Sequence, residues 1–324
     1  MKPVPESTLP KPGSICLVVC YFGSFPPYFD CVLRSCALNP DIDWLIFTDQ
    51  SDSGNLPSNV RLRKTTLGEL RSRFSDKLGF DVALERPRQL CNLKPAFGYL
   101  FDEALTHYEF WGHCDLDLIF GDVRNFVRKE ILASYDRILD LGHLCLYRNN
   151  EKVNQYFMLE APGVPHYKQV FQQGIEMAFD EWQGVYRIFR YHNIPQYHAD
   201  VIVDIIPPNR WKYPRFEGIG IRNYLFQVFY WYKGKVFQCY LSEHGAPIDV
   251  EYAYIHFQKR HLPAPGFNPS QAHGFLITPD GFFPYSREEL TREDFCKYNQ
   301  EHSRPFSQLA QAAYSSMRRR LGLS

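Results

Sequence analysis

The sequence predicts an α/β fold in which helices flank a mostly parallel, Rossmann-like sheet, and two patterns in its first half indicate this. Short runs of branched and aromatic residues alternate with longer helical segments, in the order strand, helix, strand. Glycine, proline, asparagine and aspartate stand between these segments, where strands and helices end. This order implies parallel strands joined by right-handed crossovers, with ligands bound at the carboxyl ends of the strands.

The expected elements can be placed in chain order from these patterns. Glu69 follows Thr66 by three residues, which is the spacing of a capping box at the start of a helix. Pro95 is compatible with the first turn of the following helix. We expect strands over residues 14–20, 44–47, 59–62, 108–111, 118–120, 143–147, 202–206 and 253–257, and helices over residues 28–38, 66–78, 94–105, 123–132 and 164–179.

Three residues follow the first two strands at their carboxyl ends. Tyr21 and Phe22 come directly after the first strand, and Asp49 comes after the second. Because ligands of parallel sheets bind at this edge, the three are candidates for contacting a nucleoside. The alternative is that they are ordinary loop and capping residues.

Asp115 and Asp117 lie after the apolar strand in the middle of the chain. Two carboxylates at i and i+2 of an extended segment lie on the same side and repel each other where water is scarce. A cation should therefore lie beside them, and hard oxygen ligands favour Mg²⁺ or Mn²⁺ shared with substrate phosphates. The alternative is a pair of solvated aspartates at a strand end, since a bare Asp-x-Asp is a short motif.

Other charged residues could complete a site of this kind. Lys94 at a helix start can reach a phosphate, or can be a solvated surface lysine. The acidic pair Asp180-Glu181 stands before Trp182, an arrangement that suits a catalytic base or acceptor binding, or else a helix end that exposes two charges. His256 ends a late strand and could be a third metal ligand, although a single histidine in this place is often structural.

The two residues Lys259 and Arg260 follow His256 closely and could neutralise phosphate oxygens. The composition points to no other class of partner. Lys and Arg together number 36, as do Asp and Glu, so no whole-chain charge favours nucleic acid. The nine cysteines lack CxxC spacing, which indicates reduced thiols rather than a zinc site or a disulfide framework.

The chain is expected to form a single α/β domain over residues 14–265. Residues 1–13 lack an apolar signal core and are expected to be a flexible lead-in, and no apolar run approaches the roughly 20 residues that span a bilayer. Residues 266–324 are expected to be an extension that ends in a basic amphipathic helix over residues 305–324. Such a helix can lie on an anionic membrane surface, or it can dock on the domain or fray. The expected location is the cytoplasm, with peripheral contact at the inner face of the cell membrane.

These motifs together resemble bacterial glycosyltransferase-like proteins of polysaccharide assembly. The resemblance extends from about Ile15 to Arg260 and rests on five segments: Tyr21-Phe22-Gly23, Phe47-Thr48-Asp49, Asn92-Leu93-Lys94-Pro95, Trp111-Gly112-His113-Cys114-Asp115-Leu116-Asp117 and Ile255-His256-Phe257-Gln258-Lys259. It implies a GT-A fold, a nucleotide-diphospho-sugar donor, and Mn²⁺ or Mg²⁺ held by Asp115 and Asp117, one of which also lies near the ribose.

The late segment is similar to the His-x-x-Gly-x-x-Lys segment of glycogenin-type retaining enzymes. There the histidine completes the metal shell and the lysine contacts the diphosphate, which are the roles implied for His256 and Lys259. This chain lacks the glycine and brings the lysine closer, so the retaining or inverting outcome stays open.

The predicted function is transfer of a sugar from a nucleotide-diphospho-sugar, with a UDP-sugar as the expected donor, to a glycan or lipid-linked saccharide in surface polysaccharide assembly. Asp180 or Glu181 would deprotonate the acceptor hydroxyl in an inverting reaction. One alternative is a non-catalytic scaffold that binds sugars or proteins. Another is a haloacid-dehalogenase-type phosphotransferase, whose Asp-x-Asp normally follows the first strand with Thr or Val two residues later. Here the pair lies past residue 100, and Ile119 occupies that position.

Overall fold

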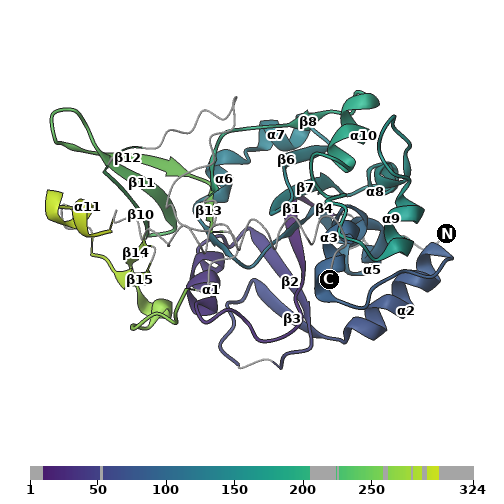
Figure 1. The fold of residues 1–324 in the computed structure, drawn as a ribbon, viewed down its shortest axis with the longest axis horizontal. Helices are drawn as coiled ribbons and strands as arrows, with labels where there is room; N and C mark the ends of the chain where they lie inside the picture. The colour runs from purple at the N-terminus through teal and green to yellow at the C-terminus, as the bar shows by residue number, and fades with distance from the viewer. Residues whose placement is uncertain are drawn as a thin grey trace, which may run out of the picture. The chain divides into compact units, whose positions relative to one another are not determined.

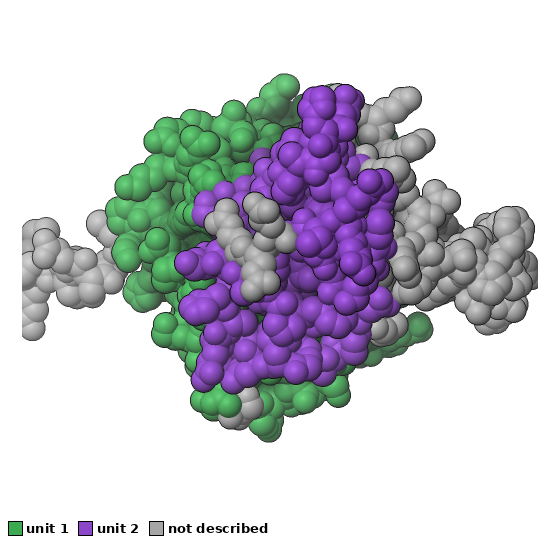
Figure 2. All heavy atoms as spheres, turned by 90° about the vertical axis from the view of Figure 1, so that its left-hand side faces the viewer, with its two compact units in different colours: residues 1–116, 122–199 green, residues 117–121, 200–324 purple. Residues whose placement is uncertain are grey.

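A computed structural model describes residues 10–51, 54–204, 224, 226–257, 262–278, 280–286 and 290–298. Figure 1 shows the helices and strands of the chain as a ribbon. The chain divides into two compact units, which Figure 2 shows in different colours. Unit 1 comprises residues 1–116 and 122–199, and unit 2 comprises residues 117–121 and 200–324. The chain therefore enters unit 2 for five residues, returns to unit 1, and enters unit 2 again after Ala199.

Unit 1 is built on a sheet that, in the described part of the chain, has seven strands in the order β3-β2-β1-β4-β7-β6-β8. The first four strands in this order are parallel, β7 is antiparallel to β4 and to β6, and β8 is parallel to β6. The strands are β1 (Lys11–Cys20), β2 (Ile42–Thr48), β3 (Val60–Lys64), β4 (Tyr108–Cys114), β6 (Arg137–Leu141), β7 (Leu144–Arg148) and β8 (Gln196–Tyr197). The expectation of an α/β unit with a mostly parallel sheet is confirmed.

The first half of unit 1 follows its local sequence signals closely. Helix α1 (Phe29–Ala37) connects β1 to β2 as a crossover between parallel strands. Helix α2 (Leu67–Leu78) begins at Thr66, whose side chain accepts the backbone N–H of Glu69 while the Glu69 carboxylate accepts that of Thr66. The predicted capping box is therefore present.

Three segments predicted as single helices are shorter or broken. Residues 94–105 form the 3₁₀ turn η3 (Lys94–Ala96) and the helices α4 (Phe97–Leu100) and α5 (Asp102–Leu105). Residues 94–101 are buried apart from the partly exposed Tyr99, whereas residues 102–104 are exposed, so packing around the first part of the segment overrides helical periodicity. The helix predicted over residues 123–132 is broken into α6 (Val123–Phe126) and α7 (Lys129–Ser134). The helix predicted over residues 164–179 is shortened to α9 (Tyr167–Gln173), which ends at Gly174 with φ +64°. The remaining short elements are η2 (Pro87–Gln89), α3 (Leu90–Leu93), α8 (Glu151–Asn154), η4 (Tyr156–Met158) and α10 (Val185–Tyr191).

The aromatic residues of unit 1 fill its core. Phe101 stacks on Phe47 with ring centroids 4.3 Å apart and meets Phe74 edge-on at 5.4 Å. Trp111 of β4 stacks on Tyr147 of β7 at 4.5 Å and donates its indole N–H to Asn154. Ring pairs of this kind bury large apolar areas in specific geometries, so they hold β4 firmly in the middle of the sheet.

Unit 2 contains, within its described residues, a five-stranded antiparallel sheet in the order β12-β11-β10-β14-β15. Its strands are β10 (Gln227–Tyr232), β11 (Lys235–Leu241), β12 (Pro247–Tyr252), β14 (Gly274–Thr278) and β15 (Gly281–Pro284), with the turn η5 (Pro269–Gln271) and helix α11 (Arg292–Tyr298). The sequence had not indicated this sheet. The expected boundary at residue 265 falls inside unit 2, and strands β14 and β15 replace the start of the expected helical extension.

A smaller sheet of unit 2 completes the described elements. Its strands are β5 (Leu118–Phe120), β13 (Tyr254–His256) and β9 (Ile202–Asp204), with β13 antiparallel to β5 and parallel to β9. Helices among the described residues all fall short of the length and apolar character needed to cross a bilayer. Residues 1–9 of the expected lead-in and the expected helix over residues 305–324 lie outside the described residues.

Candidate metal and nucleotide-sugar site

Lys94 is a buried lysine of unit 1 that binds the first aspartate of the Asp-x-Asp segment. Its Nζ donates to Asp115 Oδ1 at 2.8 Å and to the carbonyl oxygen of Gly142 at 2.9 Å, and lies 3.3 Å from Asp180 Oδ2. Lys94 is 8% exposed and Asp180 is 2% exposed. The alternative of a solvated surface lysine is therefore wrong.

Burial and charge act against each other in this cluster of Lys94, Asp115 and Asp180. Burial alone would lower the pKa of Lys94, but the neighbouring Asp115 and Asp180 carboxylates raise it well above the usual value. Burial raises the pKa of Asp180 to about 7, although Lys94 acts in the opposite direction. The Lys94 ammonium therefore keeps its charge at neutral pH, and the Asp180 carboxyl stays protonated to a higher pH than an ordinary aspartate does.

Gly142 gives this cluster its close packing. A Cβ at this position would lie 2.7 Å from Glu181 Cγ and 3.0 Å from Asp180 Oδ2. The missing side chain thus lets the Gly142 carbonyl and the Asp180 carboxylate approach Lys94 together. Glu181 itself is exposed.

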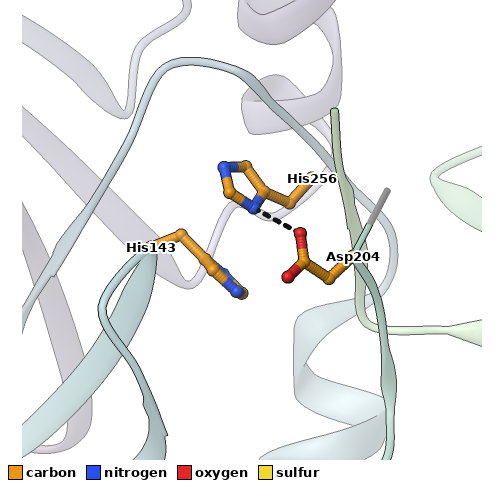
Figure 3. A group of neighbouring side chains, drawn as sticks. All are labelled: His143, Asp204 and His256. Carbon is orange, nitrogen blue, oxygen red and sulfur yellow. Dashed lines mark hydrogen bonds and ion pairs between the residues drawn. The ribbon is translucent and has the colours of Figure 1, made fainter. Parts of the chain in front are cut away.

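Asp117, His256 and Asp204 form a second cluster, which belongs to unit 2. Strands β13 and β9 run parallel with His256 opposite Asp204, and His256 Nδ1 lies 2.9 Å from Asp204 Oδ1 (Figure 3). The other ring nitrogen, Nε2, lies 3.4 Å from Asp117 Oδ1. The backbone N–H of Phe257 donates to the Asp117 carbonyl at 3.1 Å, which fixes the Asp117 backbone beside the end of β13.

His256 is 5% exposed and lies between two carboxylates. Burial would lower its pKa, but the hydrogen bonds to Asp117 and Asp204 outweigh this and raise the pKa of His256 to about 10. In the absence of another cation the imidazolium thus balances the two carboxylates. The sequence indicated Asp117 and His256 but not Asp204, because the pairing of β9 with β13 joins residues far apart in the chain. The signal that could have indicated Asp204 is its place at the end of the short apolar run Ile202-Val203.

The residues of this cluster suit a hard divalent cation. A histidine that binds a metal commonly donates its second ring N–H to a carboxylate, which fixes the ring and its tautomer. Asp204 stands in that position and leaves Nε2 directed toward Asp117. Asp115 precedes Asp117 by one residue, so the same chain segment offers a further carboxylate. Carboxylates and imidazole are ligands that Mn²⁺ accepts, and Mg²⁺ accepts the carboxylates.

The residues predicted to contact a nucleoside lie in the loops after β1 and β2. Asp49 Oδ1 accepts the backbone N–H of Gly23 at 3.0 Å and the side chain of Gln50 at 3.0 Å, and these bonds lower the pKa of Asp49, with Gln50 as the larger cause. Asp49 therefore fixes the loop after β1, as the capping alternative predicted. Tyr21 stacks on Phe25, and Phe22 packs partly buried against the core. Contact of Tyr21, Phe22 or Asp49 with a nucleoside stays a prediction.

The remaining predicted residues divide into buried, exposed and undescribed ones. The Asp180 carboxylate faces Lys94 in the core, which favours a role in holding that lysine over direct contact with an acceptor. Glu181 is exposed one residue later, so the prediction of a catalytic base stays with it. Lys259 and Arg260 lie outside the described residues.

Comparison with known proteins gives a family without an assigned function. A family model described as "Family of unknown function (DUF6625)" matches residues 17–286, and the chain belongs to this family. No curated protein sequence matches the chain.

One similar solved structure is the galactosyltransferase LgtC in complex with donor and acceptor sugar analogues. It shares 10% sequence identity at a TM-score of 0.37, over 58% of this chain and 75% of LgtC. A similarity of this size is too low to assign a fold or an activity.

Proposed function

We propose that the protein is a metal-dependent glycosyltransferase that moves a sugar from a nucleotide-diphospho-sugar, with a UDP-sugar as the expected donor, to a saccharide acceptor. The observation that carries the proposal is the His256 ring, bonded through Nδ1 to Asp204 and directed through Nε2 toward Asp117. This is the arrangement of a metal-binding histidine with its supporting carboxylate. Lys94 and Asp115 add a permanent cation and a second acidic ligand on the adjoining segment.

In this proposal Asp115, Asp117 and His256 hold Mn²⁺ or Mg²⁺. The bound ion would supply a Lewis acid for the phosphate oxygens of the donor. Lys94 keeps its proton at neutral pH and is the residue suited to neutralise charge that develops on the leaving diphosphate. Asp180 is a positioning residue, because its carboxylate and the Gly142 carbonyl fix the direction of the Lys94 ammonium. Glu181 would accept the proton of the acceptor hydroxyl in an inverting reaction.

The proposal is tested by thermal unfolding with nucleotides and nucleotide sugars, each with and without Mn²⁺. A ligand that binds the native state alone raises the melting temperature, so UDP or a UDP-sugar together with Mn²⁺ should stabilise the protein more than either alone. The double variant Asp115→Asn with Asp117→Asn should lose this joint effect. Asp76→Asn, a change of an exposed aspartate on α2, is the matched control and should behave as the wild type.

Three outcomes decide between the proposal and its alternatives. A joint effect of nucleotide sugar and Mn²⁺ that survives the double substitution would contradict the metal site. Nucleotide-sugar binding without release of the nucleotide diphosphate would favour a non-catalytic sugar-binding scaffold. Release of phosphate from a phosphomonoester, with no response to nucleotide sugars, would favour a phosphotransferase. Participation in surface polysaccharide assembly and contact with the inner membrane surface remain parts of the proposal that need separate tests.

A further inference from the structure

Unit 1 has a surface pocket that the proposed metal and nucleotide-sugar site does not use. Its volume is about 680 Å³, within the range of about 300–1,000 Å³ that small-molecule sites occupy. Side chains from the loop after α9 and from the start of α10 line it, among them Ile175, Glu176, Met177, Trp182, Gln183 and Arg187. Trp182 is 50% exposed and Ile175 is 62% exposed, although large apolar side chains are usually buried.

The wall of this pocket is held in place by the segment that precedes Lys94. The buried Gln89 donates its side-chain N–H to the Gly174 carbonyl at 2.7 Å. Asn92, 3% exposed, donates to the Ile175 carbonyl at 2.6 Å and accepts the backbone N–H of Met177 at 3.0 Å. Bonds on both sides of Glu176 thus fix the loop backbone. Because this wall is already ordered, binding of a ligand to it does not carry the entropy cost of ordering the loop.

The chemistry of the pocket suits a sugar ring. The exposed face of the Trp182 indole can pack against the C–H face of a pyranose, and the ring is supported by Tyr186 with centroids 5.1 Å apart. Gln183, Glu176 and Arg187 supply donors and acceptors for hydroxyl groups around that face. Glu176 pairs with Arg88 at 2.8 Å, and Arg187 donates to the Gly163 carbonyl at 3.2 Å, so both charged side chains are held in place beside the Trp182 ring.

The pocket is connected to Lys94 through residues of unit 1 on two sides. Trp182 follows Asp180 by two residues, and the Asp180 carboxylate lies 3.3 Å from Lys94 Nζ. On the other side, Asn92 holds the pocket loop and stands two residues before Lys94. The pocket residues are therefore linked, through Asn92 and Asp180, to the part of unit 1 that holds Lys94.

We propose that this pocket binds a sugar residue of the glycan acceptor, with Trp182 as its stacking platform. This inference rests on the proposed function, because it assigns the acceptor side of the same reaction. It names a binding surface for the saccharide that is formed by different residues from those that hold the metal.

The test is saccharide binding measured without nucleotide or metal. Saturation-transfer NMR with lactose, cellobiose and chitobiose at millimolar concentration should detect binding of at least one of them to the wild type. Trp182→Ala should weaken that binding about tenfold, the size expected when a stacking ring is lost, and Trp182→Phe should weaken it less. Tyr191→Ala is the matched control, because Tyr191 is an aromatic residue of α10 that is 59% exposed and does not line the pocket.

The outcomes separate the pocket from the proposed reaction. Absence of binding by all three saccharides, or equal binding by the wild type and a folded Trp182→Ala variant, would overturn the pocket assignment. Thermal unfolding of each variant shows whether it is folded. A Trp182-dependent saccharide signal in a protein that releases no nucleotide diphosphate from any nucleotide sugar would support the saccharide pocket and overturn the transferase. Nucleotide-sugar turnover without saccharide binding would overturn the pocket alone.

Discussion

Asp115 and Asp117 are separated by one residue, yet they are balanced by two different kinds of cation. Asp115 pairs with the ammonium of Lys94, which also lies beside Asp180. Asp117 lies beside the imidazole of His256, whose other nitrogen bonds Asp204. Each cluster thus has two carboxyl groups around one basic side chain.

The two clusters differ in whether the basic side chain can lose its proton and bind a metal ion. The pKa of Lys94 is raised well above its usual value, so the ammonium stays charged and cannot act as a metal ligand. An imidazole can release its proton to become a metal ligand, with the proton lost as the metal binds. The cluster around Lys94 is therefore a fixed cluster with a permanent charge. The cluster around His256 is an exchangeable site, because its proton can be replaced by a metal ion. Four predictions test this contrast, in order of decreasing effect.

Replacement of Lys94 should have the largest effect on stability. In Lys94→Met two carboxylates lose their cation, and one of them is fully buried, so we expect the free energy of unfolding to fall by about 3 kcal/mol. Urea unfolding in the presence of EDTA measures this. Lys77→Met removes the partly exposed lysine of a surface pair with the exposed Asp102, and this control should change stability by less than about 1 kcal/mol. Similar losses in the two variants would show that Lys94 is not a buried structural charge.

Replacement of Asp204 should weaken the exchangeable site without removing it. Asp204→Asn keeps a hydrogen-bonding side chain but loses the carboxylate that supports His256, so Mn²⁺ affinity should fall by about 10- to 100-fold. Calorimetric titration with Mn²⁺ measures this affinity. His256→Ala removes a ligand and should lower the affinity further, whereas Asp76→Asn should leave it unchanged. An Asp204→Asn variant with wild-type affinity would contradict the supporting role of this carboxylate.

A methyl group at position 142 should disturb the fixed cluster and not the exchangeable one. The new Cβ of Gly142→Ala would lie within 3.0 Å of Asp180 and Glu181 atoms, and overpacking of this kind costs about 1–3 kcal/mol. The free energy of unfolding should fall by that amount, with Mn²⁺ affinity retained. Gly68→Ala is at a helical glycine where the nearest atom to the added Cβ is Thr66 Oγ1 at 4.0 Å, so it should be neutral or slightly stabilising. Equal behaviour of the two variants would contradict the close packing at Gly142.

The pH dependence of stability should report Asp180. Its pKa is raised from the usual 3.8 to about 7 in the folded protein, so the native state binds more protons than the unfolded state between these values. Stability therefore falls as pH rises through this window and levels off above it. This pKa of about 7 already includes the opposing effect of Lys94. Urea unfolding at pH 5 and pH 8 should show a weaker pH dependence in Asp180→Asn than in the wild type. An unchanged dependence would assign the titration to another group.

Local signals in the sequence predicted the parallel half of unit 1 well. The apolar runs of β1 and β2 and the capping box at Thr66 are properties of neighbouring residues, and they appear where expected. The break of the helix predicted over residues 94–105 was not anticipated, because the mostly apolar residues 95–101 fit a helical pattern as well as they fit a buried irregular segment. The burial of Asp180 could not be read from the Asp-Glu-Trp sequence either, since it depends on Lys94 and Gly142.

Features that depend on distant pairing were missed. Asp204 reaches His256 only because β9 and β13 pair. In the antiparallel sheet of unit 2 the pairing of β10 with β14 joins strands about 45 residues apart, whereas the pairs β10-β11 and β14-β15 are local hairpins whose signals were overlooked. Asp115, Asp117 and His256 were found as chemical types at strand ends, which the sequence displays directly. Their partners were not found, because a partner is defined by the fold and not by its spacing.

Strand β5 has a consequence for how the protein is made. Leu118, Ile119 and Phe120 are fully buried, and they pair with β13, whose residues are synthesised more than 130 positions later. During translation unit 1 can fold while these three apolar residues still lack their partner strand. The nascent chain therefore exposes an aggregation-prone segment until residue 256 has left the ribosome. A gene fragment that begins at residue 200 would lack this strand, so recombinant unit 2 needs residues 117–121 supplied as a linked or separate peptide.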